Sequence, residues 1–203
     1  MRKKYVALGL LLTPLLALSQ ISNKTYIGIS SDSLVAMHYL EFIDDSSLYL
    51  KSIPDYPNHS FSIASTHANR PLNIPFHYIK DGGKLLLRSK CTLYPDERKY
   101  MGEKIGFSDS VILQIDGKAL LNRQGRIAYM QKQDYENSPL MQVFLEGKIY
   151  SFKKPSSKSR ALKKKVGKMD LSLYSLVLYK GLEAFEHHGY DAISGIIECK
   201  KKE

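Results

Sequence analysis

Tryptophan is absent from this chain of 203 residues, and cysteine occurs only twice. Two cysteines, Cys91 and Cys199, cannot form the disulfide framework that small secreted domains use in place of a core. We therefore expect a hydrophobic core, which a chain of this length can build. The two thiols are a candidate disulfide in an oxidising compartment, or two separate buried thiols that act as small apolar groups.

Sequence motifs for catalysis and cofactor binding are also missing. The chain has no Gly-x-Ser-x-Gly elbow, no protease-like cysteine context and no phosphate-binding glycine loop. None of the six histidines shows a metal-ligand spacing. We therefore expect a protein that is not an enzyme and has neither a cofactor nor a metal site. The enzymatic alternative is a hydrolase in which His59 or His67 meets a carboxylate in one cleft.

Two histidines fall on predicted strands. His38 lies in phase with apolar residues such as Leu40 and Phe42, so we expect a hydrogen-bonded histidine in the core rather than a metal ligand. His77 follows Phe76 on a later strand and has the opposite phase, which predicts a position at the surface or at a sheet edge.

Long apolar runs are confined to the start of the chain. Three basic residues, 2–4, precede an apolar run of 14 residues, and Ala17-Leu18-Ser19 forms a small-x-small site. This order is typical of a secretory signal peptide, and the run is shorter than the roughly 20 residues that span a bilayer. We predict a signal peptide over 1–19 and cleavage before Gln20. No transmembrane segment is expected in the mature chain, which would be periplasmic, at the outer-membrane periphery, or secreted.

Charge changes along the chain and suggests a domain boundary. Residues 21–147 carry 14 Lys+Arg and 14 Asp+Glu, whereas residues 148–203 carry 13 and 6, a net charge of +7. The chain lacks the interleaved aromatic and basic residues of RNA-binding or single-strand-binding proteins, and an exported protein rarely meets nucleic acid, so none is expected as a partner. Two lysine runs, 163–165 and 200–202, are either solvated ends of elements or a patch that attracts an anionic lipid or polysaccharide surface.

The neutral block, 20–146, is predicted to be an antiparallel β-barrel or sandwich. Nine short apolar runs alternate with turn signals, and no helix of standard length is expected. The clearest hairpin turn is Asp81-Gly82-Gly83, because glycine accepts the positive φ angles of tight turns. The run 34–43 is apolar on both alternations, which predicts a strand buried on both faces.

The opening stretch "TYIGIS…LEFIDDSSLYLKS" resembles small lipocalin-like barrels, although that family usually places a tryptophan where this chain has none. The resemblance implies a barrel-like shape and, as an alternative function, a carrier of a small apolar ligand. Tyrosine is plentiful, at 14 residues. Core and cross-strand packing explains the tyrosines on the predicted strands, and a sugar-binding or peptide-binding face is the alternative.

The basic block, 147–203, has a different pattern. A short helix is expected near 156–167, followed by a strand over 171–179, a helix of about two turns, and a last strand over 195–200. Gly189 stands where a left-handed conformation ends the second helix. Two strands joined through a helix predict a βαβ-like unit with a right-handed parallel crossover.

This last segment resembles the plug domain of TonB-dependent outer-membrane receptors, in the form common in Bacteroidota. An apolar strand, a small helix that ends at a glycine, a five-residue loop and a Gly-apolar-apolar strand follow in the family's order. His188 stands where the family usually has tyrosine. The matching positions are Gly181, Glu183, Ala184, His188, Gly189, Gly195, Ile196 and Ile197.

The resemblance covers about 60 of the 203 residues. No membrane barrel follows the motif, and no TonB box is recognisable after the leader, so the resemblance implies a plug-like α+β module rather than a receptor. Such modules contain no catalytic residues. We expect a non-enzymatic envelope protein of a Gram-negative bacterium with a binding or assembly role, with an envelope protein as its partner. A small apolar or sugar ligand is the alternative partner.

Overall fold

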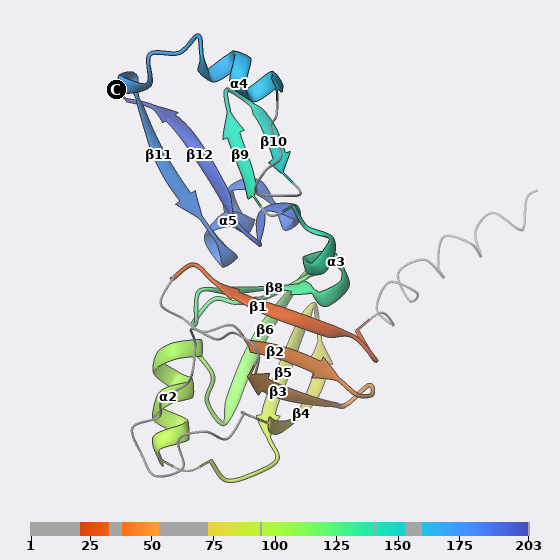
Figure 1. Cartoon of the computed structure of the whole chain (residues 1–203). Coiled ribbons are helices and arrows are strands. Elements are labelled where there is room, and N and C mark those ends of the chain that lie inside the picture. Colours follow the sequence, from red (N-terminus) through yellow and green to blue (C-terminus); the bar gives the residue numbers. More distant parts are fainter. Residues whose placement is uncertain are drawn as a thin grey trace, which may run out of the picture.

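The computed structural model describes residues 21–32, 38–52, 73–93, 95–139, 141–152 and 160–202. Within these ranges the chain forms a closed eight-stranded barrel followed by a four-stranded sheet with short helices (Figure 1). The predicted fold class, mainly β with a small α+β module, is confirmed, and the β-domain is a barrel rather than a sandwich. The predicted signal peptide lies outside the described residues.

The barrel is an up-and-down meander in which each strand pairs antiparallel with the next and β8 pairs with β1. The eight strands of the barrel match eight of the nine predicted runs. Their bounds are β1 (Thr25–Ser30), β2 (His38–Phe42), β3 (Ser47–Ser52), β4 (Asn73–Asp81), β5 (Lys84–Ser89), β6 (Ser110–Asp116), β7 (Ala119–Asn122) and β8 (Ile127–Gln131).

Tight turns allow these strands to pair without long connections. Gly82 and Gly83 form the two-residue loop between β4 and β5, and both have positive φ, +49° and +83°. This is the backbone that a tight hairpin requires, so the hairpin predicted there is confirmed. Closure leaves the barrel without a free strand edge.

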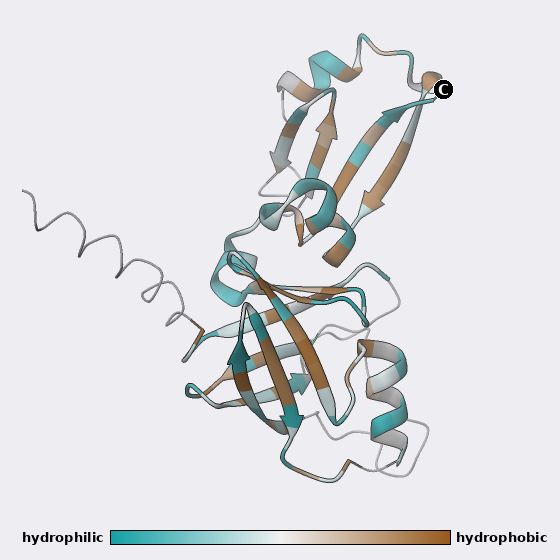
Figure 2. Ribbon diagram, turned by 180° about the vertical axis from the view of Figure 1, so that it is seen from behind, coloured by the Kyte–Doolittle hydropathy of each residue, from teal (hydrophilic) through white to brown (hydrophobic). Residues whose placement is uncertain are grey.

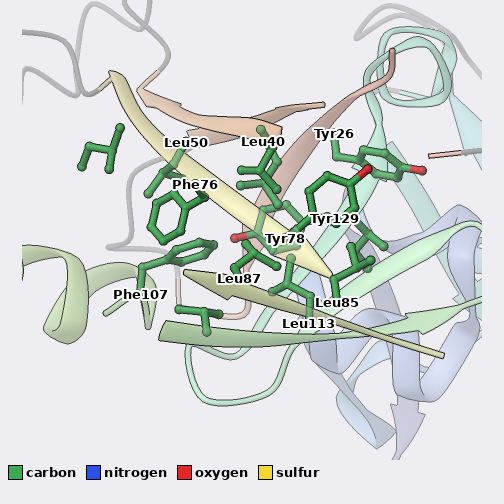
Figure 3. Packing of buried hydrophobic residues seen from close by; sticks show 14 of the residues in the cluster. Tyr26, Leu40, Leu50, Phe76, Tyr78, Leu85, Leu87, Phe107, Leu113 and Tyr129 are labelled. Carbon is green, nitrogen blue, oxygen red and sulfur yellow. The ribbon is translucent and has the colours of Figure 1, made fainter. Parts of the chain in front are cut away.

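Side chains fill the interior of the barrel (Figure 3). The ring of Phe42 packs edge-on against Tyr26 and Tyr78, with centroids 5.5 and 5.2 Å apart. An eight-stranded barrel is just wide enough either to be filled by side chains or to hold one small ligand. Among the described residues, leucines and aromatic rings from all parts of the barrel occupy this space, including Leu40, Leu50, Phe76, Leu85, Leu87, Leu113 and Tyr129.

A helix that the sequence did not predict contributes to this core. Helix α2 (Pro95–Ile105) has 11 residues, and Met101 and Ile105 from it are buried in the barrel cluster. Phe107, just after α2, meets Phe76 edge-on at 5.7 Å. The expectation of no standard helix was wrong because this segment is mostly polar and has a weak apolar face, although proline at the first helical position is a start signal.

His38 is a buried histidine of the core, as predicted. Its Nε2 lies 2.7 Å from the Tyr129 hydroxyl, and both side chains are almost fully buried. Gly28 on β1 makes room for this pair, because a Cβ there would lie 2.7 Å from the Tyr129 ring and 2.9 Å from His38 Nε2. His77 is exposed on β4, which agrees with the prediction of a surface position.

The strand buried on both faces is not the one that was expected. In β2, burial alternates, so only one face of the strand lies in the core. By contrast, all four residues of β7 and four of the five in β8 are buried. Their second face is covered from outside the barrel by the C-terminal part of the chain, as shown below.

The second sheet has the strand order β10-β9-β12-β11. Its elements are α3 (Lys132–Asn137), which leads from the barrel, β9 (Met141–Leu145), β10 (Lys148–Phe152), α4 (Arg160–Val166), η1 (Leu171–Leu173), β11 (Tyr174–Tyr179), α5 (Gly181–His188), η2 (Tyr190–Ala192) and β12 (Ile196–Lys201). The boundary therefore lies before β9. The boundary predicted between 146 and 147 falls in the β9–β10 turn, where the charge changes but the sheet continues. We call residues 141–202 the C-terminal module.

The predicted parallel crossover is wrong. Strands β11 and β12 are antiparallel neighbours, and the parallel pair is β12 with β9. Helix α5 has eight residues and so a length of about 12 Å, whereas the six residues of β11 extend about 20 Å. The helix is too short to return the chain to the start of β11, so it turns the chain at one end of the sheet (Figure 1).

Alkaline pH should unfold the barrel through its buried tyrosines. Burial raises the pKa of Tyr26 to about 12, that of Tyr78 to about 12, and that of Tyr129 well above its usual value. A tyrosine of the unfolded chain has a pKa of about 10. The neutral rings therefore stabilise the fold below about pH 10, and this contribution is lost as pH rises from about 10 to about 12.

The check is to follow tyrosinate absorbance and far-ultraviolet circular dichroism in one titration. We expect both signals to change together, and we expect Tyr78→Phe to unfold at higher pH. This variant loses the hydrogen bond that the Tyr78 hydroxyl donates to the carbonyl of Asp44, so its stability at neutral pH should fall by about 1 kcal/mol. Full titration of the tyrosines near pH 10 without unfolding would contradict the prediction.

Candidate functional site

The eight plug-like motif positions come together around one short turn of the C-terminal module. Gly181, Glu183, Ala184 and His188 lie in α5, and Gly189 ends it with φ +80°. A left-handed conformation was predicted for Gly189; its φ is positive, but its ψ of −169° lies outside the left-handed helical region, so only the sign of φ agrees. Its N–H donates to the carbonyl of Phe185 at 2.8 Å. The remaining positions are Gly195, Ile196 and Ile197, where β12 begins.

Gly181 sets how closely this turn approaches the barrel. Its φ is +56°, and a Cβ at this position would lie 2.2 Å from the carbonyl oxygen of Ile29 on β1. No other residue type fits this distance, since real Cβ contacts are longer than 3.0 Å. The start of α5 thus lies directly against the barrel backbone (Figure 1).

A barrel residue also caps α5. The Ser31 hydroxyl accepts a hydrogen bond from the Glu183 N–H and donates one to the Lys180 carbonyl, both at 3.0 Å. Lys180, the residue before the helix, makes no side-chain cap of its own. The first N–H groups of a helix lack partners within it, and Ser31 provides one across 152 residues of sequence.

Apolar side chains fill the contact between the barrel and the C-terminal module, which we call the seam. Leu182 of α5 and Ile193 after η2 pack on the outward-facing side chains of β1, β7 and β8. The barrel side of this cluster consists of Ile27, Ile29, Ala119, Leu121, Ala128 and Met130. This contact explains why β7 and β8 are buried on both faces.

Ion pairs surround the seam at its exposed rim. Arg126 pairs with Glu183, and Arg123 pairs with Glu186. Exposed ion pairs contribute little stability, typically below about 1 kcal/mol each. These two pairs therefore affect the orientation of α5 on the barrel more than the strength of the contact. Neither Ser31 nor these arginines could be predicted as seam residues, because their partners lie about 60 to 150 positions away in the sequence.

The double histidine 187–188 serves packing. The His188 side chain is 7% exposed, its ring lies 4.9 Å from that of Phe144, and its Nε2 lies 3.4 Å from Glu198 Oε2. His187 lies against the ring of Tyr179, with centroids 4.6 Å apart. Among the described residues, no three His, Cys, Asp or Glu side chains gather in a way that would hold a metal ion.

The structure does not pair the two cysteines. Both thiols are free, and Cys91 is exposed after β5 of the barrel, whereas Cys199 is half-buried on β12 of the C-terminal module. The proposed disulfide is therefore wrong, and so is a buried thiol at Cys91. The two residues belong to separate sheets, which the spacing of 108 positions could not reveal.

Strand β11 is an outer strand of the second sheet, and its outer backbone groups face away from β12. The Leu173 carbonyl accepts a hydrogen bond from the Lys202 N–H at 2.7 Å. Bonded and non-bonded pairs alternate in an antiparallel ladder, so the backbone groups of Tyr174, Leu176 and Leu178 point outward. No other element of the described chain lies beside this edge (Figure 1).

Exposed leucines and lysines accompany this edge. Leu176 is 72% exposed and Leu178 is 55% exposed, and β11 is apolar over most of its length (Figure 2). Lys201 on β12 is the register partner of Tyr174 on β11, and the Lys200 ammonium group donates to the Tyr179 hydroxyl at 2.6 Å. We call β11 with these residues the β11 edge. It is basic, apolar and open to pairing.

Described residues line at least two surface cavities. One of about 380 Å³, the seam cavity, lies where α3 and the β6–β7 turn meet β9, β10 and η2. Its lining includes Lys118, Asp134, Gln142 and Tyr190. The second, of about 480 Å³, lies on the outside of the barrel over β5, β6 and β7 and includes Lys84 and Ile112.

No helix of the described chain is long and apolar enough to cross a membrane. No family model matches this sequence, and no curated protein or solved structure matches it either. Both resemblances noted in the sequence therefore stay predictions.

Replacing Gly181 by alanine should disrupt the seam. The added Cβ strains a left-handed backbone and also overlaps the Ile29 carbonyl oxygen. Gly117→Ala is the matched control, because Gly117 has nearly the same φ, +55°, with no atom within 4 Å of the added Cβ. Backbone strain alone should cost about 1–2 kcal/mol in both variants.

Because of the overlap, the free energy of unfolding should fall by at least about 2 kcal/mol more in Gly181→Ala than in Gly117→Ala. Urea denaturation of the full chain with both variants measures this difference. Equal losses would mean that α5 does not approach β1 as closely as described.

Proposed function

We propose that this protein is an exported, non-enzymatic envelope protein of a Gram-negative bacterium that binds a partner protein through the β11 edge. The partner would add an extended segment to the second sheet, with backbone hydrogen bonds for affinity and side-chain contacts for selectivity. The observation that carries the proposal is an open strand edge with two strongly exposed leucines, Leu176 and Leu178.

Exposed apolar edges are a hazard that most proteins avoid. Soluble proteins shorten, charge or cover their edge strands, because an open edge invites pairing with other chains. Here the barrel is closed and has no edge, whereas β11 presents six residues with a leucine at each of two exposed positions. A partner strand explains why this edge keeps its leucines.

Charge indicates the chemistry of that partner. Residues 148–203 carry a net charge of +7, and Lys168, Lys180, Lys201 and Lys202 lie near the ends of β11 in the chain or in the sheet. An extended segment with alternating acidic and apolar residues complements this edge. A second copy of the chain would bring equal charges together, so we favour a different protein as the partner.

Two alternatives have less support. A carrier needs an internal cavity, and the barrel interior of the described chain is packed with side chains. A hydrolase needs a histidine and a carboxylate in an accessible cleft. His188 and Glu198 are close, but their side chains are only 7% and 17% exposed, and neither lines a described cavity. His59 and His67 lie outside the described residues.

Export is supported by the order of charge, apolar run and small residues over 1–19, and an envelope role by the resemblance to plug domains. We expect expression in a Gram-negative host to place the protein in the periplasmic or outer-membrane fraction, with Gln20 as its first residue. Cell fractionation and N-terminal sequencing measure both. A cytosolic protein that still begins with Met1 would contradict the proposal.

The β11 edge is tested by a proline that removes one outward N–H. Leu176→Pro should abolish partner binding and leave the pairing with β12 in place, because its N–H does not take part in that ladder. Ile149→Pro is the matched control. Ile149 is 50% exposed on β10, the opposite outer strand, and its N–H also points outward.

The partner is first identified by a photoreactive amino acid placed at position 178 in the intact cell. The crosslinked segment is then synthesised, and its affinity is measured for the wild type and both variants. We expect an acidic, extended segment whose affinity falls at least about tenfold with Leu176→Pro only. Crosslinks to a second copy alone, or equal losses with both prolines, would contradict the proposal.

A further inference from the structure

The seam cavity is built by two parts of the fold that are distant in sequence. Lys118 comes from the β6–β7 turn of the barrel and Asp134 from α3, whereas Gln142, Ser151 and Tyr190 come from the C-terminal module. Its volume, about 380 Å³, lies within the range of small-ligand sites, which extends from roughly 300 to 1,000 Å³. The cavity exists only while the C-terminal module is docked on the barrel.

Hydrogen bonds hold the polar walls of this cavity in place. The Tyr190 hydroxyl accepts from the Gln131 N–H at 3.0 Å and donates to Asp134 Oδ2 at 2.9 Å. Lys118 Nζ lies 3.6 Å from the same carboxylate oxygen. Gln142, which is 3% exposed, donates to the Asp191 carbonyl at 2.6 Å. A binding site requires such preorganised polar groups.

The polar groups of the walls are mixed in charge. Lys118 lines the cavity together with two acidic residues, Asp134 and Asp191, and with Gln142 and Ser151, whose side chains carry an amide and a hydroxyl group. Both described contacts of the Asp134 carboxylate use Oδ2, so its other oxygen is an acceptor for a ligand. Such walls offer donors and acceptors side by side and no strong field of one sign. They suit a neutral ligand with several hydroxyl groups, each of which can donate and accept.

Apolar surface completes the site. Ile149 is 50% exposed at the cavity, and Met130 and Pro139 also line it. The Tyr190 hydroxyl is already engaged, and Lys118 Nζ lies 5.9 Å from the centroid of the Tyr190 ring, so the ring and this ammonium group lie side by side at the cavity. Aliphatic and aromatic surfaces contact the C–H groups of a ring-shaped ligand, and the polar groups bind its hydroxyls.

We propose that the seam cavity binds a small cyclic polyol, namely one or two sugar rings. The site is independent of the β11 edge, and it needs both the barrel and the C-terminal module. Binding should therefore stabilise the docked arrangement, because a ligand that binds only the native state stabilises that state. At typical ligand efficiencies, an affinity on the order of 1 mM is expected for one sugar ring.

The test is a nuclear magnetic resonance titration of the ¹⁵N-labelled protein. The probes are glucose, galactose, N-acetylglucosamine, maltose and cellobiose, with glycine and putrescine as a zwitterion and a cation of comparable or smaller size. We expect at least one saccharide to shift the amide signals of Gln142 and Tyr190 in a saturable way. Signals around the barrel cavity at Ile112 should stay in place.

Variants then assign the site. Lys118→Met combined with Asp191→Asn should weaken saccharide binding at least about tenfold, because both residues line the cavity. Both residues are exposed, so the variant should stay folded although it loses the Lys118 contacts with Asp134 and with the Tyr190 ring. Lys84→Met, an exposed lysine at the other cavity, is the control and should bind as the wild type does. Gly181→Ala should also weaken binding, although it changes no residue of the cavity.

Each remaining outcome overturns the proposal. It fails if no saccharide gives saturable shifts, if only glycine or putrescine does so, or if the shifts fall outside the seam. It also fails if the Lys118→Met/Asp191→Asn variant, shown to be folded by its spectrum, binds a saccharide as well as the Lys84→Met control. Loss of partner binding at the β11 edge has no bearing on these results.

Discussion

The close approach of Gly181 to β1 is the contact on which the arrangement of the two sheets depends. With no Cβ at this position, the start of α5 reaches the Ile29 carbonyl, and the Ser31 hydroxyl can cap the helix. Leu182 and Ile193 are then buried against the outer face of the barrel. The position of the second sheet, and the cavity beside it, follow from this one short distance.

Closure of the barrel determines where the fold has open strand edges. A closed, filled barrel has neither a strand edge nor, in the described chain, an internal space for a ligand. The open edges therefore belong to the second sheet, at β10 and β11. The barrel contributes Lys118 to the seam cavity, and helix α3, which follows β8, contributes Asp134.

Local signals in the sequence predicted much of the fold. Turn glycines such as Gly82 and Gly83 and alternating apolar residues predicted the strands, and the phase of His38 predicted its burial. Helix α2 was missed because most of its residues are polar, so its periodicity is weak. The boundary was placed six residues late because charge changes within the β9–β10 hairpin, whereas strand pairing, which defines the sheet, continues through it.

The sequence by itself determined the mainly β fold and the positions of most strands, because alternation and turn chemistry act between near neighbours. For the same reason it indicated that Gly181, Gly189 and Gly195 mark turns. Only the tertiary structure decided that β11 and β12 are antiparallel, that Ser31 caps α5, and that Lys118 meets Tyr190 across the seam. These contacts join residues from 17 to 152 positions apart. Their geometry depends on how the whole barrel closes and where its outer face becomes apolar, which no short stretch of sequence contains.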